Sequence, residues 1–296
     1  MYLKTLIGIE NSETKGGFSN MKIRKGRLNI TEFVSDEVIR KISVVQEAVR
    51  PYRLKVEGWA LSQAKIRGIN VPGVLDYYQD KDGREVLVLE RIHGQHLLWR
   101  CSQENIRCMS EVGEQILLLS NASLDCGWGW INPSTMAGVS ENWQSFLLLY
   151  VQTYHKLFIE KNILEESHFQ MVYRAIDSID LNVSEPCLVN RDIKPSNIIK
   201  DDSGKVWIVD WENTILGDSL YDLVIFGMRY GHGALWESLV SGCGLYVSSP
   251  RYVLYEVIGL IGLIDFYREH QINYKGRQKQ LRRLIQRFGS VMSEPQ

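Results

Sequence analysis

One stretch of the chain, residues 187–223, constrains its fold more than any other. It reads CLVNRDIKPSNIIKDDSGKVWIVDWENTILGDSLYDL. Residues 187–189 and 206–209 are apolar runs typical of buried strands. Between them, Ile198 and Ile199 resume the apolar pattern, and residues 201–204 have a turn sequence. Asp192 and Asn197 follow the first run, and Asp210 follows the second. The pattern predicts a hairpin-like unit that brings these three polar side chains to one end.

The residue types at that end suit phosphoryl transfer. Magnesium prefers hard oxygen ligands, so the Asn197 carbonyl and the Asp210 carboxylate are candidate metal ligands. A carboxylate just before them, Asp192, can accept or orient the proton of an attacking hydroxyl group. Lys194 stands where its ammonium group can reach a transferring phosphate. We predict Asp192 and Lys194 as catalytic residues, and Asn197 and Asp210 as magnesium ligands.

These motifs also resemble a known family. NRDIKPSN resembles the catalytic loop of the protein-kinase superfamily, with Asn190 where His is usual. VDWE followed by GDSLYDL resembles the aminoglycoside phosphotransferase and choline-kinase branch of small-molecule kinases. The resemblance implies an α+β, two-lobed, protein-kinase-like fold, with a small, mostly β lobe over residues 1–92 and a larger, mainly helical lobe over 93–296. It further implies that Asp222 caps a helix and braces the catalytic loop.

The same resemblance directs attention to a glycine-bearing turn near the N-terminus. Residues 11–20, NSETKGGFSN, lie between a predicted strand at 3–9 and a return strand at 21–25. Family members often carry a GGxSN turn here, which implies that Gly16, Gly17 and Ser19 approach the nucleotide phosphates. An ordinary hairpin turn is the alternative interpretation.

A cation that holds the remaining phosphates is expected on the next segment. Residues 36–50 fit a helix and a strand equally well. On a strand, Arg40 and Lys41 face opposite ways, so only one of them can point into the site. We choose Lys41, because Glu57 lies in a predicted helix and can pair with it. The alternative is that both charges are simply solvated.

The expected connection between the lobes follows the buried strand at 85–89. The backbone of Glu90 to Ile92 is predicted to meet the purine base, and Gly94 suits a change of chain direction. Beyond it, the periodicity predicts helices over 104–120, 143–159, 165–179, 236–247 and 252–267, and an amphipathic terminal helix. Residues 121–140 are expected to form a Gly- and Trp-rich loop. Its tryptophans, with Trp143, either pack in the core or line an acceptor pocket.

Composition limits the other classes of function. The formal net charge is −1, which gives no global field for nucleic acid or for an anionic membrane. The five cysteines contain no CxxC pair, and we expect a cytoplasmic protein with no signal layout and no membrane span. The oligomeric state is not visible in the sequence.

The sequence thus predicts an enzyme that transfers the γ-phosphoryl group of ATP or GTP, with Mg²⁺, to a hydroxyl group of a small molecule. The acceptor class stays open between an antibiotic, a sugar, an amino alcohol and a natural-product intermediate. Two alternatives remain. Lys194 and Pro195 favour a protein Ser/Thr kinase, although only eleven residues separate Asp210 from Asp222. The missing His at position 190 favours a catalytically inactive, kinase-shaped binding protein.

Overall fold

The computed structural model describes residues 23–25, 29–44, 52–181, 183–245, 247 and 249–291. The predicted phosphate-contacting turn with Gly16, Gly17 and Ser19 lies outside these residues, as does the predicted strand at 3–9.

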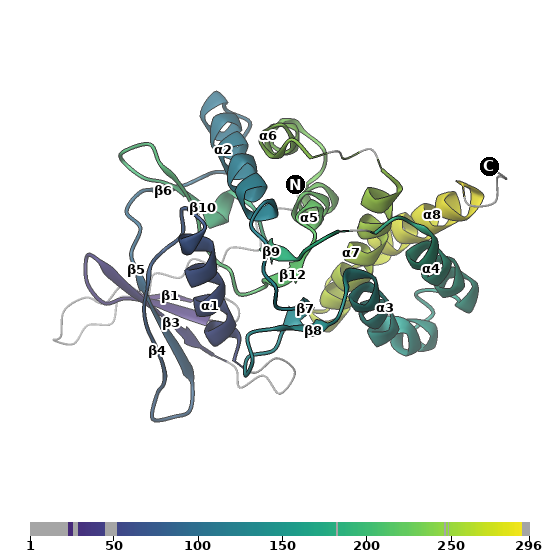
Figure 1. Cartoon of the computed structure of the whole chain (residues 1–296), viewed down its shortest axis with the longest axis horizontal. Coiled ribbons are helices and arrows are strands. Elements are labelled where there is room, and N and C mark those ends of the chain that lie inside the picture. The colour runs from purple at the N-terminus through teal and green to yellow at the C-terminus, as the bar shows by residue number, and fades with distance from the viewer. Residues whose placement is uncertain are drawn as a thin grey trace.

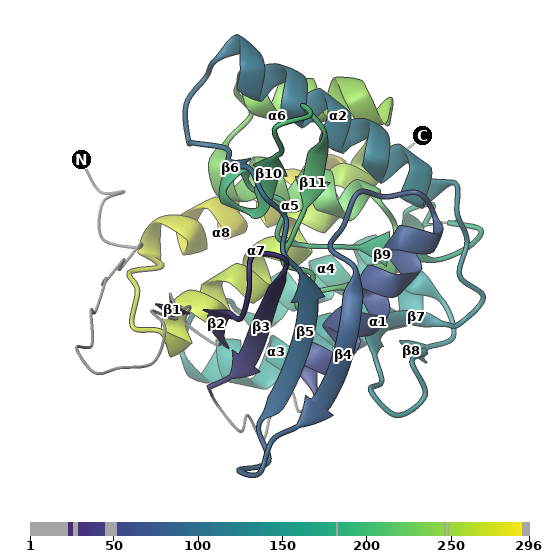
Figure 2. The same ribbon diagram turned by 90° about the vertical axis from the view of Figure 1, so that its left-hand side faces the viewer.

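The N-terminal part of the described chain is a five-stranded antiparallel sheet with the order β1-β2-β3-β5-β4. Its strands are β1 (Ile23–Lys25), β2 (Asn29–Phe33), β3 (Val38–Ser43), β4 (Val74–Gln79) and β5 (Glu85–Glu90). Helix α1 (Arg53–Ile66) packs on one face of this sheet, as Figure 2 shows. A Cβ built on Gly58 of α1 would lie 3.0 Å from Leu87 of β5, so this glycine permits the close approach of helix and strand.

Strand β3 resolves the ambiguity of residues 36–50 for the part that is described, because residues 38–43 are extended. The register pairs Lys41 with Leu87, whose side chain is fully buried against α1. Directly paired residues in antiparallel strands point to the same face. Lys41 therefore faces α1, whereas Arg40 points to the other face and pairs with Glu32 at 2.8 Å.

The C-terminal part is mainly helical. Its helices are α2 (Gln103–Ser120), α3 (Trp143–Glu160), α4 (Glu166–Ser178), α5 (Leu220–Tyr230), α6 (Ala234–Cys243), α7 (Pro250–Glu269) and α8 (Lys275–Val291). Figure 1 shows the sheet and α1 at one end of the molecule and α3, α4, α7 and α8 at the other. The fold class predicted from the sequence is therefore confirmed, a small β part followed by a larger helical part.

Local signals explain where several of these helices begin. The side chain of Ser102 accepts a hydrogen bond from the Asn105 N–H at 3.2 Å and caps α2. Asn142 caps α3 in the same way, accepting from the Ser145 N–H at 2.8 Å. Helix α7 has both a serine cap and a proline at its first position. The predicted and observed positions of α2, α3 and α7 agree. The helix predicted at 236–247 is observed at Ala234–Cys243, because the chain leaves the helix at Gly244 with φ 63°.

Two small sheets separate the helical part from the N-terminal sheet. One contains β6 (Gln95–His96), β10 (Ile198–Lys200) and β11 (Val206–Ile208), and the other contains β7 (Trp128–Ile131), β8 (Gly138–Ser140), β9 (Cys187–Val189) and β12 (Ile215–Gly217). β10 and β11 form the hairpin expected from the sequence. Gly94 enters β6 with φ 151°, and a Cβ there would lie 2.3 Å from the Lys200 carbonyl oxygen. The direction change at Gly94 therefore requires glycine.

The second small sheet corrects one prediction. Residues 121–140 are not only a loop, because they contain β7 and β8. β12 pairs with β7 on one side and with β9 on the other. These strands have three or four residues each, which is too short for a periodic signal, and β12 is distant in sequence from both of its partners.

Trp143 lies at the centre of the helical part. It is 2% exposed, donates from Nε1 to the Tyr255 hydroxyl at 2.6 Å, and stacks on Phe146. The Tyr255 hydroxyl in turn donates to Asp218 at 2.8 Å. Trp128 is also buried, at 7% exposure, so these two tryptophans follow the core-packing interpretation.

Among the described residues, no helix is both long and apolar enough to cross a membrane.

Candidate active site

The loop between β9 and β10 carries the predicted catalytic residues, and Asp222 of α5 holds it from below. The Asp222 carboxylate accepts the backbone N–H of Asn190 at 3.0 Å and that of Arg191 at 2.6 Å. Asp222 is 2% exposed, so water cannot take the place of its carboxylate as the acceptor for these two N–H groups. Arg191 has φ 65°, a strained conformation for a residue with a side chain. The two hydrogen bonds stabilise that conformation and direct the next residue, Asp192, into the site.

We expect Asp222→Ala to lower the free energy of unfolding by about 2–5 kcal/mol, because two buried N–H donors lose their acceptor at about 1–3 kcal/mol each. Chemical denaturation measures this loss. Asp222→Asn keeps one carbonyl oxygen and should lose less. Asp202→Ala, at an exposed turn position, is the matched control. Equal stabilities of Asp222→Ala and Asp202→Ala would contradict the bracing role.

Asp192 is 8% exposed and is surrounded by donors. Its Oδ1 accepts from the guanidinium group of Arg229 at 2.8 Å, and its Oδ2 contacts the Lys194 ammonium group. The Asn197 amide nitrogen also donates to Asp192 Oδ2, at 3.0 Å. Because the nitrogen of Asn197 is used in this way, its carbonyl oxygen is the atom available to a metal ion.

Asn190 has a structural role at the position where the resembling family usually has His. Its amide nitrogen donates to the Asp210 carbonyl oxygen at 3.1 Å, and its side-chain oxygen accepts from the Asp192 N–H at 2.9 Å. One side chain thus ties the loop of Asp192 to the segment of Asp210. The absence of His at position 190 is therefore no argument that this loop is disordered or misplaced.

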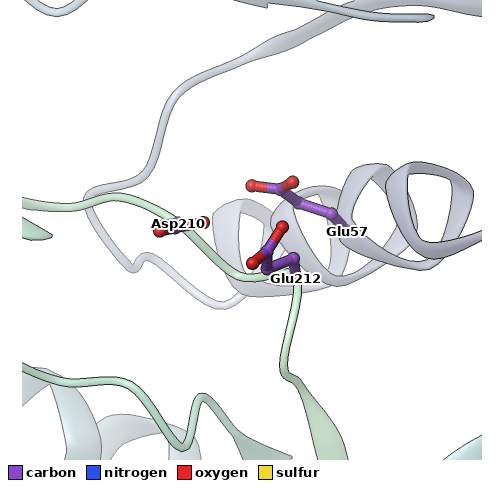
Figure 3. A group of neighbouring side chains, drawn as sticks. All are labelled: Glu57, Asp210 and Glu212. Atoms are coloured by element: carbon purple, nitrogen blue, oxygen red, sulfur yellow. The ribbon is translucent and has the colours of Figure 1, made fainter. Parts of the chain in front are cut away.

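On the other side of the site, the Lys41 ammonium group lies between two carboxylates. It is 2.7 Å from Glu57 of α1 and 3.0 Å from Asp210. Glu57 is 1% exposed and also accepts the Trp211 N–H at 3.2 Å. Figure 3 shows Glu57, Asp210 and Glu212 converging from α1 and from the segment after β11. The pair that joins the sheet to α1 is thus linked directly to the segment that carries Asp210.

The electrostatic environment favours the charged forms of Lys41 and Asp210, whereas burial raises the pKa values of Glu57 and Glu212. Burial opposes the charge of Lys41, but Asp210 and Glu57 outweigh it, so the pKa of Lys41 is raised and the ammonium form persists. Burial also opposes ionisation of Asp210, and Lys41 outweighs it, so the pKa of Asp210 is lowered. Burial, assisted by the charge of Asp210, raises the pKa of Glu212 to about 7.

The residues present fit a magnesium ion. Ligand oxygens of Glu57, Asp210 and Glu212 lie within 4.8 Å of one another, and carboxylate and amide oxygens are the ligands that Mg²⁺ prefers. Glu57 is already paired with Lys41 and held by a backbone N–H, so it is the least available of the three. The predicted ligands Asn197 and Asp210 remain the better candidates, with Glu212 beside them.

The predicted purine-contacting segment follows β5. The Glu90 side chain accepts from the Gly73 N–H at 2.9 Å and pairs with Lys65 at 3.2 Å. These contacts leave the backbone, not the side chain, for the predicted contact with the purine base. Backbone N–H groups of Glu90 and Arg91 donate to Gly73 and Glu37, whereas the Ile92 N–H has no acceptor among the described backbone groups. A cavity of about 550 Å³ at the rim of the sheet includes Glu90, but neither Lys41 nor Asp192 lines it.

Sequence reasoning missed Arg229 and assigned no role to Glu212. Arg229 lies seven residues after Asp222 on α5, and positions separated by seven share one helix face. Since Asp222 was expected to face the loop, that spacing was the available signal for Arg229. Glu212 had only its place in VDWE to mark it. Its Oε2 accepts from the Asn29 amide of β2 at 2.5 Å, a contact that no local pattern reveals.

The arrangement of the two parts around this site defines a kinase-like protein. A model of the phosphotransferase enzyme family (APH) matches residues 57–242, and the chain belongs to that family. No curated protein sequence matches the chain.

Solved structures agree on the fold. A thermostable mutant of aminoglycoside phosphotransferase APH(4)-Ia in its apo form superposes with a TM-score of 0.69 at 15% identity, covering 94% of this chain and 96% of that chain. A ternary complex of such a mutant with AMP-PNP and hygromycin B also gives 0.69, at 17% identity and with 93% and 95% covered. The GDP complex of wild-type aminoglycoside 2'-phosphotransferase-IIIa gives 0.60 at 13% identity, with 90% and 91% covered.

Proposed function

We propose that this protein transfers the γ-phosphoryl group of ATP or GTP to a hydroxyl group of a small molecule. The observation that carries the proposal is the Lys41 ammonium group held 2.7 Å from Glu57 and 3.0 Å from Asp210, at the junction of the sheet and the catalytic loop. A fixed cation there is suited to the negative charge of a nucleoside triphosphate. Nucleotides occupy two of the similar structures, which supports a nucleotide as the donor.

Each residue has a role in this proposal. Asp192 orients the acceptor hydroxyl group and takes its proton, and Lys194 contacts the γ-phosphate. Lys41, fixed by Glu57, contacts the other phosphates, while the backbone at Glu90 to Ile92 binds the base. Asn197 and Asp210 would hold Mg²⁺, which neutralises phosphate charge when bound. Positioning and charge neutralisation are the protein's main contributions to the rate.

A small acceptor is favoured over a protein. The segment between Asp210 and α5 is occupied by β12, which pairs on both sides with β7 and β9. It therefore offers no extended surface on which a peptide can lie. Hygromycin B and kanamycin occupy similar structures, so aminoglycosides are one acceptor class to test.

A screen of hydroxylated metabolites and antibiotics tests the proposal. The readout is acceptor-dependent release of ADP or GDP in the presence of magnesium. We expect at least one small acceptor and no phosphorylation of generic peptides. Peptide phosphorylation that Asp192→Ala abolishes would favour the protein-kinase alternative. Nucleotide binding without turnover of any acceptor would favour an inactive binding protein.

Lys41 and Arg40 provide a matched pair of variants. We expect Lys41→Ala to raise the nucleotide KM and to lower kcat by about 10-fold or more, because it removes a charge-assisted contact made by a buried cation. Arg40→Ala removes a partly buried pair with Glu32 on the other face of the sheet and should change both parameters little. Steady-state kinetics with varied nucleotide decide between them. The reverse ranking would place Arg40, not Lys41, in the nucleotide site.

A further inference from the structure

The side of Asp192 that faces α3, α5 and α8 is rich in cations and donors. Arg229 lies 2.8 Å from Asp192, and its side chain is 29% exposed. The Arg229 guanidinium group also donates to the Arg191 carbonyl oxygen at 3.4 Å, so it lies against the loop that carries Asp192. Lys194 adds a third positive charge, in contact with Asp192.

One carboxylate, Asp192, is shared between Arg229 and Lys194. Asp222 accepts two backbone N–H groups, and Asp192 is the proposed base. At the end of α5, Arg277 of α8 donates to the Met228 and Arg229 carbonyl oxygens at 2.9 and 3.3 Å and brings a further cation to this side.

Several donors on this side lack an acceptor. Among the described residues, the buried side-chain atoms without a hydrogen-bond partner include Nε of Arg191, Nε of Arg229 and Nε1 of Trp130. All three atoms are donors only. A buried donor without a partner is costly, and of these three residues Arg229 is the one in contact with Asp192, with 29% of its side chain exposed. A ligand with acceptor oxygens can therefore reach the exposed part of the Arg229 guanidinium group.

A polycationic acceptor would be repelled by the cations beside Asp192. Aminoglycosides carry several ammonium groups, and like charges a few ångströms apart repel one another when partly shielded from water. Donor-only groups also give an ammonium group nothing to bind. An acceptor with a carboxylate or phosphate group near its reacting hydroxyl would instead pair with Arg229, because guanidinium binds both groups through two hydrogen bonds.

We propose that the acceptor is an anionic hydroxylated small molecule, whose carboxylate or phosphate group is bound by Arg229 beside Asp192. This inference rests on the proposed function, because it names the acceptor class of the same site. Arg229 is here a specificity residue for the acceptor as well as a partner of Asp192.

The test compares matched probes of different charge on the full chain. Binding of glucose, glucuronate, glucosamine and inorganic phosphate is measured by calorimetry, with and without saturating AMP-PNP and magnesium. We expect glucuronate or phosphate to bind at least about 10-fold more tightly than glucose, and glucosamine to bind no better than glucose. The inference is overturned if neither anion binds more tightly than glucose.

Variants of Arg229 test whether the preference for the anion depends on this side chain. Arg229→Ala should reduce the preference for the anion over glucose about 10- to 100-fold, and Arg229→Lys should keep part of it. Lys156→Ala removes an exposed cation, 90% accessible, as the matched control for net charge. Circular dichroism verifies that the variants fold. If Arg229→Ala leaves the preference unchanged, a general electrostatic effect explains it and the inference fails.

Phosphoryl transfer to the same probes and to kanamycin separates this inference from the proposed function. Transfer to kanamycin or glucosamine that Arg229→Ala leaves intact would overturn the anionic acceptor and keep the phosphotransferase. Arg229-dependent anion binding without phosphoryl transfer to any compound in the screen would support the anion site and contradict the phosphotransferase.

Discussion

Replacing Asp192 with alanine should lower kcat by about 10²–10⁴-fold and leave nucleotide affinity nearly unchanged. A general base contributes to the rate by about this factor and adds little to ground-state binding. The structure adds a second reason, because the Asp192 carboxylate accepts hydrogen bonds from Arg229, Lys194 and Asn197 at the same time. Its loss leaves two cations facing each other, which disturbs the position of the acceptor.

Steady-state kinetics and nucleotide titration measure the two quantities separately. Asp192→Asn keeps the shape of the side chain but not its charge, and we expect a smaller loss than in Asp192→Ala. Asp202→Ala serves as the surface control. Near-normal turnover by Asp192→Ala would remove Asp192 from the chemistry.

Asp210→Ala is expected to abolish the magnesium-dependent part of nucleotide binding. Asp210 is the predicted anionic metal ligand, and magnesium bridges such a carboxylate to the phosphates. A ligand at 100 times its Kd stabilises the folded protein by about 2.7 kcal/mol, so the loss is measurable as a thermal shift. The shift is recorded with nucleotide, with and without magnesium.

Asp210 also neutralises the charge of Lys41, so Asp210→Ala changes the electrostatic environment of Lys41 as well. Lys41→Ala therefore serves as the comparison, since it should weaken nucleotide binding with and without magnesium alike. If Asp210→Ala keeps the wild-type response to magnesium, the metal ligand lies elsewhere, and Glu212 becomes the next candidate.

The helical part of the fold was accessible from local patterns. Helices α2, α3 and α7 begin at capping residues that the sequence displays, Ser102, Asn142 and Ser249. Strands β7, β8 and β12 were not accessible in this way. β7 and β12 pair with each other across more than eighty residues, β8 pairs with β7 alone, and all three are too short to leave a mark on local periodicity.

The residues of the candidate site differ in the same way, because some could be predicted from local sequence and others depend on packing. Asp192, Asn197 and Asp210 stand on one hairpin, so their proximity follows from the turn between β10 and β11. Lys41 depended on the register of β3 against β5, which a sequence with two equal periodicities does not fix. Arg229 and Asn29 reach the site from other elements, and only the packing of those elements brings them there.

The sequence by itself determined the chemistry-bearing residues and their order, because strands, turns and polar residues alternate within one short stretch. The tertiary structure decided which charges face the acceptor. Arg229 lies on α5, and it reaches Asp192 because α5 packs against the loop between β9 and β10. Side chains at long sequence separation interact only after the backbone between them has been ordered, and no local pattern encodes that outcome.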